Sequence, residues 1–298
     1  MPVTLALPPP SFHSFSHSVP FAYFSPALPS MSILRYLSSH SHRFRRRVAT
    51  VAAAVRQDTT IWTQAPLLEI DPVAESLFHV TIDVSDSPDV ATSHTRAGQY
   101  IQLRITDVAK PSFLAIASPP AFSVTKGAFE FLVKSIPGSI AELLCGLKKG
   151  DVVELTQAMG NGFAIDRIEP PEKYPTVFIF ATGSAISPIR SLIESGFSDK
   201  RSDVRLYYGA RNLKRMAYQD RFRDWESLGV KIVPVLSQPD DSWNGEKGYV
   251  QAAFSSLKKI TSPMATGAVL CGQKLMTEEV TSMLVADGVS SENILKNF

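Results

Sequence analysis

A turn that could bind a pyrophosphate lies at Thr182–Pro188. The continuous apolar run TVFIFAT (176–182) predicts a strand buried on both faces, and GSAISPIRSLI follows it directly. Gly183 would let the backbone approach a ligand, while Ser187 as N-cap and Pro188 at the first helical position predict a helix start. A helix N-terminus after a buried strand presents free N–H groups and the positive end of the helix dipole. We therefore predict a dinucleotide site here, with an ordinary strand-to-helix turn as the alternative.

Further motifs surround this turn in a fixed order: VKSIPGSIAELL (133–144), LKKGDVVELTQAMGNGF (147–163), YYGAR (207–211), VLSQP (235–239), GEKGYVQ (245–251) and VLCG (269–272). Together they resemble the ferredoxin–NADP reductase superfamily, whose nucleotide loop reads T-G-[ST]-G-[IL]-x-P. The resemblance covers roughly residues 62–298, and the plant plastid branch of fruit-protein-type reductase-like proteins is the most similar. It implies an oxidoreductase in which FAD passes hydride or electrons between NAD(P)H and an acceptor.

The resemblance also implies roles for single residues. The expected cofactor-binding positions are Ala117 and Ser118 in the first flavin motif, Gly138 and Ser139 at the flavin phosphates, and Gly183, Ser184 and Pro188 at the coenzyme pyrophosphate. Cys271 and Gly272 would lie near the nicotinamide. Phe298 ends the chain, where the family often has an aromatic residue that covers the flavin ring, and a frayed terminus is the alternative.

The first flavin motif departs from the family pattern R-x-[YF]-S-[IL]-A-S. This chain has KPSFLAIAS (110–118), which puts Ser112 at the arginine, Leu114 at the aromatic residue and Ala115 at the serine. A charge-assisted hydrogen bond typically contributes about 1.5–3 kcal/mol, so we expect weakened flavin binding. Lys110 and Phe113 are nearby but out of register. In the nucleotide loop, Ala185 replaces a second glycine, which would be costly if that position needs a positive φ or a close approach of the ligand.

The residues that would indicate NADPH or NADH as the coenzyme do not agree with one another. NADP-specific members use Ser-Arg followed by Lys-x-Tyr for the 2′-phosphate and the adenine. This chain has Ser237-Gln238, which lacks the guanidinium fork suited to phosphate, but it keeps Lys247 and Tyr249. The resemblance therefore implies NADPH or NADH as the coenzyme.

Two kinds of element must position these residues. The segments 77–84, 99–106, 129–136 and 151–158 read as short strands between turns, with a helix at 139–145 capped by Ser139, which indicates an antiparallel barrel or sandwich. After Thr176, strand and helix patterns alternate, which predicts a doubly wound α/β domain with a parallel sheet. We expect an antiparallel flavin-binding β-barrel at 58–168, a linker at 169–175 and an α/β NAD(P)-binding domain at 176–298.

Residues 1–57 contain six arginines and no Asp or Glu. An Arg-rich, Ser-rich and acid-free leader is typical of an organellar transit peptide, and a disordered tail is the alternative. With the family resemblance, this composition predicts import into the plastid stroma.

Other classes of function find little support in the sequence. The two cysteines fall in different domains, so neither a disulfide framework nor a metal cluster is expected. No basic–aromatic stripe indicates nucleic acid, no apolar run is long enough to span a membrane, and we interpret His79 as structural and His94 as a loop residue. The broken flavin motif leaves a second hypothesis, a reductase-fold protein that binds nucleotide weakly and acts as an interaction module. A third is an electron-transfer subunit that needs a partner.

Overall fold

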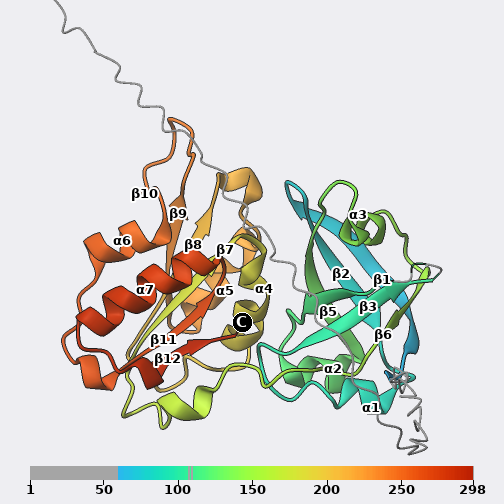
Figure 1. The fold of residues 1–298 in the computed structure, drawn as a ribbon, viewed down its shortest axis with the longest axis horizontal. Helices are drawn as coiled ribbons and strands as arrows, with labels where there is room; N and C mark the ends of the chain where they lie inside the picture. The colour runs from blue at the N-terminus through green and yellow to red at the C-terminus, as the bar shows by residue number, and fades with distance from the viewer. Residues whose placement is uncertain (1–59, 107, 109, 298) are drawn as a thin grey trace, which may run out of the picture. The chain divides into compact units, whose positions relative to one another are not determined.

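Antiparallel strands precede parallel ones along the chain (Figure 1). The computed structural model describes residues 60–106, 108 and 110–297, and residues 57–298 form one compact unit. The predicted leader at 1–57 and the predicted flavin-covering Phe298 lie outside the described residues.

The first six strands form an antiparallel sheet in the order β4-β3-β6-β1-β2-β5. Their bounds are β1 (Thr63–Ala74), β2 (Leu77–Asp83), β3 (Tyr100–Ile105), β4 (Ser112–Ala115), β5 (Ala128–Lys134) and β6 (Val152–Leu155). An antiparallel bridge between Ile116 and Phe131 joins the two edge strands, so the sheet closes into the predicted barrel. The closed wall encloses an apolar core that includes Ile82, Ile101 and Phe129.

Three short helices connect the barrel strands: α1 (Pro88–Ala91), α2 (Pro120–Lys126) and α3 (Ile140–Cys145). The predicted cap of α3 is confirmed, because the Ser139 hydroxyl accepts a hydrogen bond from the Glu142 N–H at 3.3 Å. Glu142 in turn accepts from the Gly138 N–H at 2.6 Å. The side chains of Ser139 and Glu142 therefore accept hydrogen bonds from two backbone N–H groups at this helix start.

The last six strands form a parallel sheet in the order β10-β9-β8-β7-β11-β12. They are β7 (Thr176–Thr182), β8 (Asp203–Ala210), β9 (Val230–Leu236), β10 (Glu246–Lys247), β11 (Thr266–Cys271) and β12 (Ile294–Lys296). The helices α4 (Ile186–Ile193) and α5 (Phe222–Ser227) pack on one face, and α6 (Val250–Leu257) and α7 (Lys274–Ala286) pack on the other. The predicted doubly wound α/β domain is confirmed.

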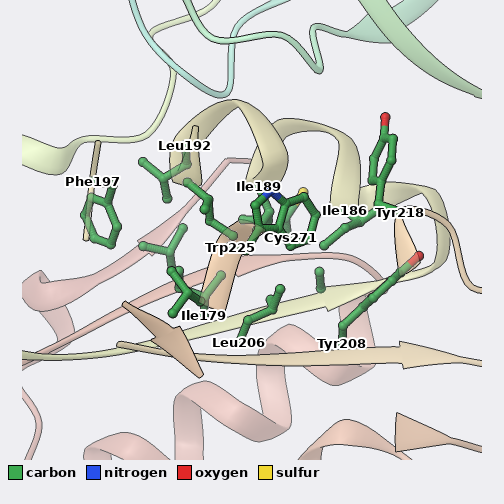
Figure 2. Close-up of a cluster of buried hydrophobic side chains, with 14 of the residues drawn as sticks. Ile179, Ile186, Ile189, Leu192, Phe197, Leu206, Tyr208, Tyr218, Trp225 and Cys271 are labelled. Carbon is green, nitrogen blue, oxygen red and sulfur yellow. The ribbon is translucent and has the colours of Figure 1, made fainter. Parts of the chain in front are cut away.

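The face under α4 is a dense apolar layer (Figure 2). Ile186, Ile189 and Leu192 of α4 lie over Ile179 and Leu206 of the sheet, and all are buried. Because this layer fixes α4 on β7 and β8, the loop between β7 and α4 has a rigid base.

Hydrogen bonds join α4 to the barrel. The Ser187 hydroxyl donates to the Ala115 carbonyl oxygen at 3.1 Å, and the Ser191 hydroxyl donates to the Ser118 carbonyl oxygen at 2.8 Å. Between them, the Arg190 guanidinium contacts the Glu130 carboxylate at 2.5 Å. The helix at the predicted pyrophosphate turn is therefore also hydrogen-bonded to the barrel.

His94 lies in the loop between α1 and β3, as expected, but its side chain is buried against the barrel core. Its side chain is 2% exposed and meets the ring of Phe129 edge-on at 6.0 Å between centroids. Burial lowers the pKa of His94 from 6.5 to about 4, and the Arg96 backbone offsets only part of that shift.

This shift predicts loss of stability on acidification. Between pH 6.5 and about pH 4 the unfolded chain binds a proton at His94 that the folded chain excludes, so the free energy of unfolding falls as pH falls through this window. We expect a contribution of roughly 3 kcal/mol between pH 7 and pH 4. Urea unfolding of wild type and His94→Leu at both pH values measures it, and an equal loss in both proteins would contradict this origin.

Candidate nucleotide-binding cleft

One cavity of about 1570 Å³ is lined by both the barrel and the α/β domain. The α/β domain contributes the carboxyl ends of β7, β8, β9 and β11, and the barrel contributes β3, β4 and β5. Small-molecule sites usually measure about 300–1,000 Å³. The cleft therefore has room for two ligands of nucleotide size.

The predicted pyrophosphate turn lines this cleft, but it starts its helix differently from the prediction. A 3₁₀ turn at Gly183–Ala185 leads directly into α4, so Ser187 is the second residue of that helix and not its N-cap. Gly183 has φ of 56°, and nothing lies within 4 Å of the position that a Cβ would take there. The hydroxyl of Tyr208 donates to the Gly183 carbonyl oxygen at 3.2 Å and accepts from the Ala217 N–H at 3.1 Å. The turn is thus fixed by the Tyr208 hydroxyl and is open on the side of the cleft.

Ala185 carries no backbone strain. Its φ is −67° and its ψ is −5°, which any residue adopts readily. The part of the expected cost that a positive φ would impose is therefore absent at this alanine.

Two further glycines let strand ends approach closely at the floor of the cleft. A Cβ on Gly272 would lie 2.3 Å from the Thr182 Oγ1 and 2.7 Å from the Met276 Cε. A Cβ on Gly209 would lie 2.8 Å from the Val250 Cγ1. The Thr182 hydroxyl oxygen also accepts a hydrogen bond from the Gln273 N–H at 3.3 Å. Only glycine fits at these positions, so the carboxyl ends of β7, β8 and β11 form a shallow floor.

Cys271 lies beside this floor at the end of β11. It is 3% exposed, and burial raises the pKa of its thiol to about 12. The sulfur is therefore protonated at neutral pH, and it can shape the site or offer a weak S–H donor but cannot serve as a thiolate nucleophile.

The structure separates the predicted site residues into two groups. Seven line the cleft: Gly183, Ser184, Pro188, Ser237, Tyr249, Cys271 and Gly272. The others among the described residues lie outside its lining: Ala117, Ser118, Gly138, Ser139 and Lys247.

The barrel-side positions outside the lining have structural contacts. The Ala117 N–H donates to the Glu130 carbonyl oxygen at 2.7 Å, and the buried Ser118 hydroxyl accepts from the Glu130 N–H at 3.2 Å. Both contacts belong to the closure of the barrel. Gly138 and Ser139 are occupied with capping α3, and their neighbours Ile136 and Pro137 line the cleft instead.

Arg211 was missed by the sequence prediction. It follows the carboxyl end of β8 and lines the cleft near Ser237 and Gln238, whereas Lys247 is exposed outside the lining. Its peptide carbonyl accepts from the Gln238 N–H at 2.7 Å, which ties the ends of β8 and β9 together. The signal was present in YYGAR, as a cation directly after a strand whose end borders the ligand side.

The charged side chains of the cleft lining favour an anionic ligand. They are Glu75, Lys134, Arg211 and Arg215. Arg215 pairs with Glu75 at 2.5 Å, and this hydrogen bond lowers the pKa of the Glu75 carboxyl. Lys134 and Arg211 thus leave the cleft with a net positive charge, which suits phosphate groups.

Comparison with known proteins gives consistent matches. A family of oxidoreductase NAD-binding domains matches residues 179–282. The fruit protein pKIWI502 of Actinidia deliciosa is 49% identical over 277 residues, which covers 89% of this chain and 87% of that protein. The sulfhydrogenase 1 subunit gamma of Pyrococcus furiosus is 27% identical over 216 residues and covers 70% of each chain.

The fold is also shared with solved structures. A ferredoxin NADP+ reductase from Neisseria gonorrhoeae with bound FAD and NADP superposes with a TM-score of 0.65 at 18% identity. The match covers 80% of this chain and 99% of that one. The likeness therefore extends over the barrel and the α/β domain together.

Proposed function

The chain belongs to the ferredoxin–NADP reductase superfamily, and on that premise we propose that it is an FAD-dependent oxidoreductase that oxidises NAD(P)H and passes the electrons to an acceptor. The observation that carries the proposal is the cleft of about 1570 Å³, which is lined both by the Gly183 turn and by strands of the barrel. A flavin on the barrel side and a nicotinamide coenzyme on the α/β side would meet in it.

The residues present fit these two ligands. The backbone of the Gly183–Ala185 turn would receive the coenzyme pyrophosphate at the N-terminal end of α4, and the glycine floor at Gly209 and Gly272 would let the coenzyme approach the strand ends. Lys134 and Arg211 supply the positive charge that phosphates need. If bound there, FAD would supply the redox chemistry, the transfer of a hydride from NAD(P)H and of two electrons onward to the acceptor.

The protein would contribute position and environment to this step. The Tyr208 hydroxyl fixes the Gly183 carbonyl, and the Ser187 hydroxyl ties α4 to the Ala115 carbonyl of the barrel. These contacts hold the coenzyme side and the flavin side of the cleft in one geometry, which is what hydride transfer requires. Ala115 has no hydroxyl, so this position cannot relay a proton to the flavin.

A second candidate function rests on the first flavin motif. With Ser112, Leu114 and Ala115 on β4, the cleft lacks the family's arginine, aromatic residue and serine at these positions. A reductase-fold protein that binds nucleotide without turnover, or an electron-transfer subunit that needs a partner, would share this fold.

The proposal is tested by flavin content and turnover. Purified protein is expected to bind one FAD per chain and to oxidise NADPH or NADH with an artificial acceptor. A Gly183→Val variant should keep its FAD but lose turnover, because a branched side chain at φ of 56° distorts the turn. Wild-type protein that takes up FAD but oxidises neither coenzyme would favour the interaction module.

We further propose that the mature protein works in the plastid stroma, on the composition of residues 1–57. A reporter fused to these residues should enter chloroplasts, and a reporter that stays outside would contradict the proposal. In the described residues, no helix is long and apolar enough to cross a membrane.

Arg211 should decide the coenzyme preference. An Arg211→Ala variant is expected to raise the KM for NADPH about tenfold or more and to leave that for NADH nearly unchanged, because a charge-assisted phosphate contact contributes about 1.5–3 kcal/mol. Lys247→Ala, outside the cleft lining, is the matched control and should change neither KM by more than about twofold. A larger effect of Lys247→Ala than of Arg211→Ala would contradict this assignment and would place the 2′-phosphate at Lys247, as the sequence motif predicts.

A further inference from the structure

The first flavin motif lies on a strand with a neighbour on each side. β3 pairs with β4 directly, and the bridge between Ile116 and Phe131 brings β5 to the other side of β4. Contacts that β4 itself lacks can therefore be supplied from β3 or β5. The strands β3, β4 and β5 all line the cleft.

The β3 strand carries an aromatic side chain, Tyr100, beside the motif. Tyr100 pairs with Ala115 and Gln102 pairs with Phe113, so Tyr100 and Phe113 are diagonal neighbours on the outer, cleft-facing side of the wall. Their rings meet at 60° with 5.8 Å between centroids. Leu114, at the family's aromatic position, packs instead against the barrel core.

The Tyr100 ring is held in place. A Cβ at Gly160 would lie 2.8 Å from the Tyr100 Cε1, so the ring rests against a position that only glycine allows. The Tyr100 N–H and carbonyl are both hydrogen-bonded to Met159, at 3.1 and 2.7 Å. A ring that is fixed before binding loses little entropy when a planar ligand stacks on it.

The β5 strand ends with a cationic side chain, Lys134. Lys134 is exposed in the cleft lining, and none of the hydrogen bonds or ion pairs found among the described residues involves its ammonium group. Lys134 follows the bridge residue Phe131 by three positions, and Phe113 precedes the bridge residue Ile116 by three positions. Because the two strands run antiparallel, Lys134 and Phe113 are at the same height along the barrel wall. Lys110, close to the motif in the sequence, is outside the lining.

We propose that the strands flanking β4 replace the two contacts that its motif has lost: Tyr100 supplies the ring surface for the isoalloxazine, and Lys134 supplies the charge for the flavin phosphates. This inference rests on the proposed function, because it presumes that FAD enters the barrel side of the cleft. It differs from the superfamily pattern, in which β4 provides both groups.

Two flavins separate the two roles. FAD and riboflavin share the isoalloxazine ring, and only FAD carries phosphates. The full chain, freed of flavin, is titrated with each while the quenching of flavin fluorescence is followed, and thermal unfolding of every variant checks its fold.

Tyr100→Leu should weaken the binding of both flavins at least about tenfold and reduce the quenching, because stacking on a ring is lost. Lys134→Gln should weaken FAD binding about tenfold and leave riboflavin binding unchanged. Tyr100→Phe and Lys134→Arg should restore binding. Lys110→Gln, which removes a cation outside the cleft lining, is the control and should leave FAD binding within about twofold.

The outcomes are distinguishable. If wild type binds FAD and both Tyr100→Leu and Lys134→Gln bind it equally well, the inference is overturned while the proposed function stands. If Lys134→Gln weakens FAD and riboflavin alike, the phosphate role is overturned. If wild type binds neither flavin, the proposed function fails and the inference fails with it.

Discussion

A Gly272→Ala variant will transfer hydride at least about 100-fold more slowly than wild type while keeping its FAD. The added Cβ would lie 2.3 Å from the Thr182 Oγ1 and 2.7 Å from the Met276 Cε. The Met276 methyl group can move aside, but Thr182 begins the nucleotide turn and accepts from the Gln273 N–H. The variant must therefore displace the turn that is proposed to hold the coenzyme.

Single-turnover reduction of bound flavin measures this effect separately from acceptor chemistry. The matched control is Gly229→Ala, a glycine with φ of 90° and open space around its Cβ position, outside the cleft lining. It should lose about 1–2 kcal/mol of stability from the left-handed backbone and keep its reduction rate. Equal reduction rates in Gly272→Ala and wild type would contradict the assignment of the floor to the coenzyme.

Arg190→Met will cost about 3–5 kcal/mol of unfolding free energy, because it removes one partner from a buried charge network. The Arg190 side chain is 3% exposed and contacts Glu130 of β5 at 2.5 Å and Glu194 at 3.1 Å. Glu130 also contacts the His79 ring at 3.4 Å. Burial alone would raise the pKa of Glu130, but His79 and Arg190 outweigh burial and lower it. Without Arg190, a buried carboxylate loses its nearest charged partner.

Urea unfolding at neutral pH measures the loss. A double variant, Arg190→Met with Glu130→Gln, should recover part of it, since the uncompensated charge is then gone. Lys231→Met, which breaks the exposed pair with Asp203 at 3.0 Å, is the surface control and should cost less than about 1 kcal/mol. A similar cost for Arg190→Met and Lys231→Met would show that the network does not hold barrel and α/β domain together.

The strands and helices with strong periodicity could be predicted from the sequence. The uniform apolar run of β7 and the alternation in β2 and β3 left little choice of structure. β1 was missed although it is the longest barrel strand, because TQAPLLEIDPVA contains two prolines and its burial follows no simple alternation. β12 was missed because three residues carry no period.

Site residues could be predicted where the backbone conformation demands a particular residue type. They could not be predicted where their role depends on contacts with distant parts of the chain. Gly183 and Gly272 could be found because tight turns and close strand ends require glycine. Ser118 could not be excluded from the site by sequence, because the Glu130 and Ser191 contacts that occupy it come from elsewhere in the chain. Tyr100 and Lys134 were not visible as site residues, since only the closed barrel brings β3, β4 and β5 to one wall.

Anaerobic titration of the FAD-loaded protein with NADPH, followed in the flavin absorption band, tests the central claim most directly. We predict that stoichiometric NADPH bleaches the flavin and that admitted acceptor restores the colour. A bound flavin that keeps its full absorbance under excess NADPH and under excess NADH would contradict the assignment of this cleft to hydride transfer.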